Sequence, residues 1–150
     1  MIFIKHTQRK VKIDLKQIEK DAQKILDLLN YSDFDLGIWL TTNPSIRAYN
    51  KRYRDKDKPT DILSFPNHPE LKAGERINVV TEDDKNVGDI IISLEYVKKD
   101  AEKLGVTFEQ RMKRLLVHGI CHLLGYDHIE DSDYEVMHKK EMALLKKIEI

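Results

Sequence analysis

The sequence predicts an α+β domain in which a small mixed β-sheet packs with helices around one buried central helix. Short segments that alternate apolar and polar residues, typical of strands, are interspersed with longer segments of helical periodicity. The segment from Leu115 to Leu124 is apolar nearly all round, as expected of a helix inside a fold. At 150 residues the chain has the length of one domain, so we expect a single domain over residues 1–150.

Composition and charge narrow the class of protein. Charged residues make up 35% of the chain and sum to zero net charge, so a polyanionic partner would have to bind to a local patch. One cysteine permits no internal disulfide. The start, Met1 to His6, becomes polar too soon for a signal peptide, and no apolar run is long enough to span a bilayer. We therefore expect a cytoplasmic protein without a membrane partner.

In the first half of the chain we expect strands over Ile2 to Lys5 and Phe34 to Thr41. We expect helices over Leu15 to Leu29 and Asn43 to Tyr53. Asp14 and Gln17 form a capping box at the start of the first helix. Asn43 as N-cap and Pro44 at the first helical position start the second. The charged segment from Arg54 to Pro59 is expected to be a loop.

In the second half we expect strands over Ile62 to Phe65, Ile77 to Val80 and Val87 to Ile92, and helices over 94–104, 108–124 and 133–147. Ser93 caps the first of these helices and Gly105 ends it, while Thr107 and Gln110 form a capping box for the next. The inner side of the last helix is expected to hold Tyr134, Met137, Leu144, Leu145 and Ile148.

Three of the six histidines lie close together within Val117 to His128. His118 and His122, four residues apart on a helix, direct their rings to a common point. Gly125 ends the helix in the left-handed conformation, so the chain can turn back and bring in His128. The spacing therefore predicts three metal ligands.

Three imidazoles with one open position are typical of a catalytic zinc site, since structural sites close the fourth position with protein, usually cysteine. The only cysteine, Cys121, points about 100° away from His122 around the helix and is interpreted as core packing. Zinc held by three histidines lowers the pKa of its water to about 7, so hydroxide could attack a substrate without a protein base.

The spacing from His118 to His128 is that of the metzincin metalloproteases, H-E-x-x-H-x-x-G-x-x-H. Where those proteases carry the glutamate that takes a proton from the metal-bound water, this chain has Gly119. A peptide bond needs that base and an acid for the leaving amine, so the glycine counts against proteolysis. Hydrolysis of a phosphodiester chiefly needs a cation beside the phosphoryl oxygens.

Cations of this kind gather between Arg47 and Lys58, where six basic residues stand against two acidic ones. Tyr49 and Tyr53 lie among them, so the run could hold a nucleic-acid backbone and offer aromatic faces to its bases. A solvated helix face and loop is the alternative interpretation. Other polar residues have two readings, as cleft or ligand-orienting residues or as turn and strand-end hydrogen-bond partners: Thr60, Asp61, Ser64, Asp89 and Asp127.

Three motifs together resemble the bacterial YbeY family: the segment from Asn50 to Pro66, the run from Gly88 to Ser93, and the histidine motif with glycine at 119. They occur in the family's order, and the similarity extends over most of the chain. The resemblance implies a zincin-like α+β fold and a metal-dependent, single-strand-specific endoribonuclease. Such an enzyme acts in ribosomal RNA maturation, including 16S rRNA 3′ end processing, and in ribosome quality control.

The resemblance further implies that His118, His122 and His128 bind one zinc ion per chain, and that Arg54 is the family's functional arginine. We expect Arg54 and His118 to be the catalytic residues, and single-stranded RNA, ribosomal RNA and ribosomal subunits to be the partners of this metallohydrolase domain. A small metzincin-like metallopeptidase and an RNA-binding ribosome assembly factor with a structural zinc are the alternatives. The attacking nucleophile, metal-bound hydroxide or the 2′-hydroxyl of the RNA, stays open, as does the oligomeric state.

Overall fold

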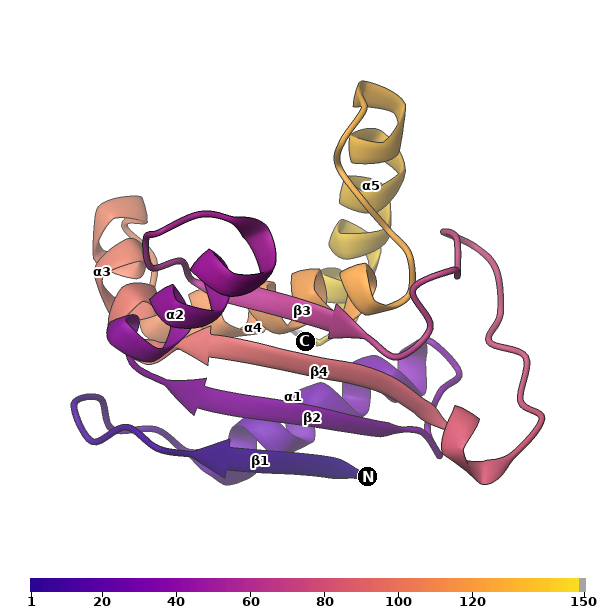
Figure 1. Cartoon of the computed structure of the whole chain (residues 1–150), viewed down its shortest axis with the longest axis horizontal. Helices are drawn as coiled ribbons and strands as arrows, with labels where there is room; N and C mark the ends of the chain where they lie inside the picture. Colours follow the sequence, from indigo (N-terminus) through magenta and orange to yellow (C-terminus); the bar gives the residue numbers. More distant parts are fainter. Residues whose placement is uncertain (149–150) are drawn as a thin grey trace.

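The computed structural model describes residues 1–148, which form a four-stranded sheet, five α-helices and one 3₁₀ helix (Figure 1). In chain order these are β1 (Ile2–His6), α1 (Leu15–Leu28), β2 (Asp35–Thr41), α2 (Asn43–Arg54), β3 (Ile62–Pro66), η1 (Glu82–Asp84), β4 (Asn86–Ser93), α3 (Leu94–Leu104), α4 (Phe108–Leu123) and α5 (Asp131–Ile148). The predicted α+β class is confirmed. The last two residues of the expected domain lie outside the described residues.

The sheet is mixed, as expected, with strand order β1-β2-β4-β3. Strands β1, β2 and β4 run parallel to one another, and β3 pairs antiparallel with β4 at the sheet edge. Pro66, predicted to follow β3, is its last residue and pairs with Gly88. An edge strand tolerates proline because one side of it needs no ladder hydrogen bond.

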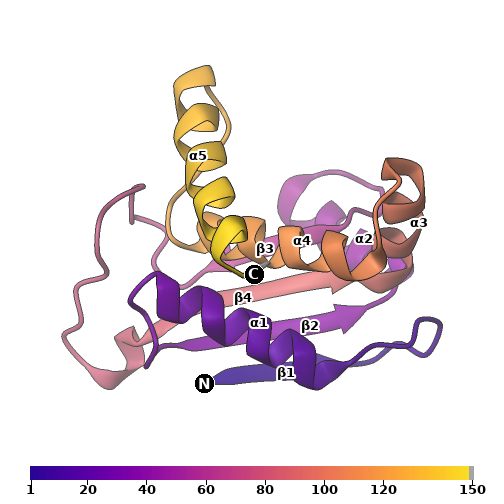
Figure 2. The same ribbon diagram turned by 180° about the vertical axis from the view of Figure 1, so that it is seen from behind.

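The sheet has one covered and one partly open face. Helices α1 and α4 cover the first, while α2 packs against β3 and β4 on the second and leaves β1 and most of β2 uncovered (Figures 1 and 2). The main core lies under α1 and α4, where Ile25, Leu36, Ile90, Leu116 and Ile120 are fully buried. Helix α4 is thus the buried central helix that the sequence predicts, with the sheet on one side and α5 on the other.

Two predicted helix ends are confirmed and two differ. The Thr107 and Gln110 capping box is present, and Gly105 ends α3 in the left-handed conformation. Thr42, rather than Asn43, is the N-cap of α2, because the Asn43 amide oxygen instead accepts a hydrogen bond from the Ser93 hydroxyl at 2.7 Å. That bond occupies Ser93, which is the N-cap of α3 but caps it with no side-chain hydrogen bond.

The first capping box is only half formed. Asp14 accepts from the Gln17 backbone N–H as expected, but the Gln17 side chain donates to Asp21 one turn later and accepts no hydrogen bond from the Asp14 backbone N–H. Helix α1 nevertheless begins at Leu15 as expected, because one capped N–H is enough to mark its start.

The strand expected over Ile77 to Val80 is wrong. The Ile77 N–H donates to the Tyr31 hydroxyl at 3.0 Å, and the Val80 N–H donates to the Asp84 carboxylate at 2.8 Å. Arg76 anchors the segment by donating to two carbonyls at the end of α1. Side chains, not a neighbouring strand, accept hydrogen bonds from these two backbone N–H groups. The segment is therefore a loop anchored by side-chain contacts.

Helix α5 begins two residues earlier than expected and buries Met137, Leu144, Leu145 and Ile148. Tyr134, predicted to face inward, is exposed and stacks on His138. Among residues 1–148, every helix is too short or too polar to span a bilayer.

Candidate metal centre

The three predicted histidine ligands converge at the C-terminal end of α4. One ring nitrogen from each of His118, His122 and His128 lies within 4.8 Å of the other two. The Nε2 atoms of His118 and His122 are 3.1 Å apart, near the separation of about 3.3 Å that two nitrogens have on a tetrahedral zinc ion. Gly125 makes the turn that returns His128, with φ of 92° and no room for a side chain beside the Leu71 carbonyl.

Glu141 of α5 contacts the far side of one of these histidines. Its Oε2 atom lies 3.3 Å from Nδ1 of His118, and both side chains are largely buried. A carboxylate can only accept here, so Nδ1 donates and Nε2 keeps its lone pair for the metal position.

The electrostatics of the site favour neutral ligands. Burial, followed by the nearby His118 and His128, lowers the pKa of His122 to about 4. Its imidazole is therefore neutral at pH 7, the form that binds a metal. Burial raises the pKa of the Cys121 thiol to about 12, so this side chain stays protonated and packs in the core as expected.

Gly119 lies where α4 approaches the sheet most closely. A Cβ atom at this position would be 2.7 Å from Cδ1 of Ile62 and 3.3 Å from Cγ2 of Ile90. The Ser64 hydroxyl donates to the Gly119 carbonyl at 3.4 Å. The glycine therefore allows close packing of α4 on the sheet, and a side chain as long as glutamate would enter the space of Ile62 and Ile90.

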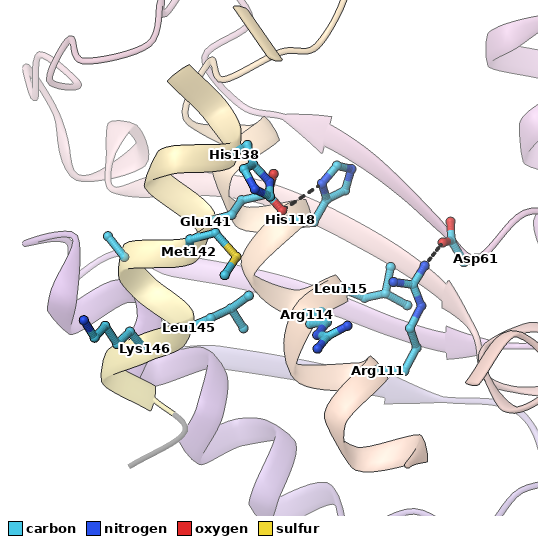
Figure 3. A pocket seen from close by; sticks show the side chains of 11 residues that line it. Asp61, Arg111, Arg114, Leu115, His118, His138, Glu141, Met142, Leu145 and Lys146 are labelled. Atoms are coloured by element: carbon cyan, nitrogen blue, oxygen red, sulfur yellow. Dashed lines mark hydrogen bonds and ion pairs between the residues drawn. The ribbon is translucent and has the colours of Figure 1, made fainter. Parts of the chain in front are cut away.

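A cavity of about 940 Å³ opens beside His118, between α4 and α5 (Figure 3). Arg111 and Asp61 line one end of the cavity. Arg111 forms ion pairs with Asp61, the residue before β3, at 3.2 Å and with Asp100 of α3 at 2.8 Å. Arg114, one helical turn before His118, also lines the cavity and is exposed. Within residues 1–148 its guanidinium has no ion-pair partner, so it is available to an anionic ligand.

The other predicted residues are distributed differently. Arg54 is the last residue of α2 rather than part of a loop, and its side chain is exposed. It lies on the helix that packs on the opposite sheet face from α4, and nothing in the described part of the chain pairs it with the histidines. Asp127 accepts from the His128 N–H at 2.7 Å, a turn-forming contact. Asp61 lines the cavity, while Asp89 lies on the open sheet face.

Glu141 and the Arg111 bridge were not predicted from the sequence. Glu141 is one of several charged residues on α5 and lies 23 positions from its partner, so no local pattern marks it. Arg111 and His118 are seven residues apart, a helical spacing that places both on one side of α4. That spacing is the one signal that could have drawn attention to the arginine.

Known proteins match this chain over most of its length. A family model described as Endoribonuclease YbeY matches residues 3–149. The protein named Endoribonuclease YbeY of Sulfurihydrogenibium sp. (strain YO3AOP1) is 42% identical over 135 residues, covering 89% of this chain and 83% of its own. The Homo sapiens protein of the same name is 34% identical over 147 residues, covering 98% and 87%. The solution structure of TM1509 from Thermotoga maritima matches with a TM-score of 0.66 and 26% identity, over 99% of this chain and 89% of that one. The chain therefore belongs to the Endoribonuclease YbeY family.

Proposed function

We propose that residues 1–150 form one metallohydrolase domain, a zinc-dependent endoribonuclease that uses His118, His122 and His128 as ligands. The convergence of three imidazole nitrogens within 4.8 Å supports this most directly. Family membership supplies the reaction class, since the relatives are named endoribonucleases. The bond that this chain hydrolyses is therefore an RNA phosphodiester.

The donor set fits zinc. Three neutral nitrogen donors and no thiolate are typical of a catalytic zinc site, although nickel, copper and iron also accept imidazole. A zinc ion bound here supplies positive charge beside the scissile phosphate and activates a water molecule. Glu141 fixes the tautomer of His118 by accepting from Nδ1, and the turn at Gly125 sets the approach of His128.

Cationic side chains are proposed to bind the phosphate groups of the substrate. Arg54 ends the last turn of α2 beside two further basic residues, Lys51 and Arg52, and is proposed to bind an RNA phosphate. On the other side of the sheet, Arg114 faces the same cavity as His118 and provides a second phosphate contact. His118 is the ligand nearest to this cavity, so it is assigned a catalytic as well as a ligand role.

The two alternatives are not favoured. A peptidase needs a general base beside the metal, and the position that carries it in the metzincins is Gly119 here. A structural zinc needs a fourth protein donor. In the described part of the chain the group of His, Cys, Asp or Glu side chains at this site has three members, His118, His122 and His128.

We further propose single-stranded ribosomal RNA within ribosomal subunits as the substrate, and the cytoplasm as the place of action. The family motifs support this substrate, and the cavity of about 940 Å³ beside His118 is assigned to a chain with unpaired bases. Helix α5, which lines one side of this cavity, projects from the rest of the molecule (Figure 2).

The test is cleavage of a short single-stranded RNA by protein purified without chelators, with the metal content of the same preparation measured. Wild type is expected to hold one metal per chain and to cut RNA but not casein. His122→Ala should lose metal and cleavage together, because two ligands hold zinc poorly. Arg54→Glu should keep the metal and lose cleavage, whereas Arg9→Glu, an equally exposed arginine outside the site, should keep both. RNA cleavage at the wild-type rate without bound metal would contradict the proposal, and cleavage of casein alone would favour the peptidase.

A further inference from the structure

The partly open face of the sheet contains a second hollow, of about 690 Å³, that the metal site does not use. Its walls carry an unusual share of aromatic rings, from Phe3, Trp39, Tyr49, Tyr53 and Phe65. Phe3 and Tyr53 are 53% and 55% exposed. Large aromatic side chains left this exposed in a cluster indicate a binding surface.

The strand register explains why the partly open face of the sheet has a hollow at this place. Phe3, Gly37, Asp89 and Phe65 pair across all four strands and so form one row on this face. Gly37 has no side chain, and the Asp89 carboxylate occupies the space above it, where a Cβ on Gly37 would collide with it. The floor between the aromatic walls is therefore an anionic acceptor. Asp89 is exposed and has no ion pair or side-chain hydrogen bond with residues 1–148.

The rim of the hollow is cationic. The Lys5 ammonium lies 4.4 Å from the centroid of the Trp39 ring, and the Arg52 guanidinium lies 5.3 Å from that of Tyr53. The last turn of α2, which carries the lining residue Tyr53, also contains Lys51 and Arg54. A ligand with a negatively charged backbone and flat, polar-edged rings complements this combination of cations, aromatic faces and a carboxylate.

We propose that this hollow binds an unpaired nucleobase of the RNA substrate, with guanine preferred. The base would stack on the aromatic side chains and donate to Asp89, while the rim cations contact the flanking phosphates. Guanine presents two adjacent donors, N1–H and the N2 amino group, which match the two oxygens of a carboxylate. Uracil presents one N–H between two carbonyls, which the carboxylate repels. This assignment rests on the proposed RNA cleavage.

The hollow and the metal centre lie on the two sides of one edge strand. Phe65 faces the hollow, whereas the preceding residue, Ser64, contacts Gly119 beside His118. Alternation along β3 therefore places the two sites on opposite faces of the same edge strand. An RNA strand that crosses this edge places one base in the hollow and a phosphate a few nucleotides away at the metal.

Trp39, the only tryptophan, reports directly on the hollow. Its fluorescence is measured while wild-type protein is titrated with 2′-O-methyl pentanucleotides, one with a central guanine and one of uridine only. We expect saturable quenching and about tenfold tighter binding of the guanine oligonucleotide, the size of one bidentate base contact. Asp89→Asn should reduce this preference to less than about twofold, and Phe3→Ala should weaken the binding of both oligonucleotides about tenfold.

Two control variants separate these effects from general ones. Asp83→Asn removes the same charge from an exposed site on η1, and Leu104→Ala removes an equally exposed apolar side chain, 55%, from α3. Both should bind like wild type. Equal affinity for the two oligonucleotides in wild type, or an unchanged preference in Asp89→Asn, overturns the proposal. RNA cleavage without quenching of Trp39 would reject the nucleobase site alone, whereas guanine-dependent quenching without cleavage would reject the proposed function alone.

Discussion

Replacement of Gly119 tests whether packing, rather than catalysis, explains the missing glutamate. In Gly119→Ala the new methyl group meets Cδ1 of Ile62 at 2.7 Å, the far end of a flexible side chain that can turn away. Overpacking costs about 1–3 kcal/mol, and alanine returns about 1 kcal/mol of helix propensity. We expect a net loss of about 0–2 kcal/mol in the free energy of unfolding.

Gly119→Glu should be far worse. The longer side chain enters the space that Ile62 and Ile90 fill, and its carboxylate would be buried without a partner. The expected loss, at least about 5 kcal/mol, is comparable with the whole stability of a typical domain. The variant should therefore be unfolded rather than a peptidase.

Urea unfolding followed by circular dichroism measures both losses, with Lys99→Glu on the exposed surface of α3 as the charge control. That control should change the free energy of unfolding by less than about 0.5 kcal/mol. A folded Gly119→Glu protein with near wild-type stability would refute the reasoning, because it would mean that α4 can move away from the sheet at little cost. Proteolytic activity in such a protein would show that the glycine alone separates the two chemistries.

Two further predictions concern the histidines. Glu141→Ala should weaken metal binding about 10- to 100-fold in competition with a chromophoric chelator, and Glu141→Gln should weaken it less because the amide oxygen still accepts from His118. If Glu141→Ala binds metal as tightly as wild type, the contact does not orient His118. The pKa of His122 near 4 lies below the unfolded value of about 6.5, so protonation favours the unfolded state and the metal-free protein should lose stability as pH falls from 6.5 to 4. The loss should be under about 3 kcal/mol, since His122 is partly exposed, and urea unfolding at pH 7 and pH 5 measures it. Equal stability at both pH values would contradict the shifted pKa.

Much of the fold could be predicted because local patterns and tertiary packing agree. Ile38 and Leu40 alternate with half-buried residues since only one face of β2 meets the main core. The capping box at Thr107 and the glycine at 125 enclose a helix whose apolar surface is contacted from several sides. The histidine site could be predicted for the same reason, because helical spacing fixes two ligands and one turn supplies the third.

The errors occur where long-range contacts override a local signal. Ile77 is apolar and buried, yet the Tyr31 hydroxyl and not a strand takes its N–H. Asn43 precedes a proline as an N-cap should, but the Ser93 hydroxyl, 50 residues away, occupies its side chain. Glu141 shows the opposite case, a functional contact with no local signal at all. None of these partners can be identified until the sheet and helices are placed together.

Gly119 connects the catalytic and binding features of the molecule. A long side chain at this position would enter the space between α4 and the sheet that Ile62 and Ile90 fill. Because the position is glycine, the edge strand lies against the helix, and Ser64 reaches the carbonyl between the two ligands. The proposed metal centre and the aromatic hollow then lie on opposite faces of β3. Gly119, which stands where the metzincins carry their general base, thus lets β3 lie against α4, so that in our proposal one RNA strand crossing β3 contacts both sites.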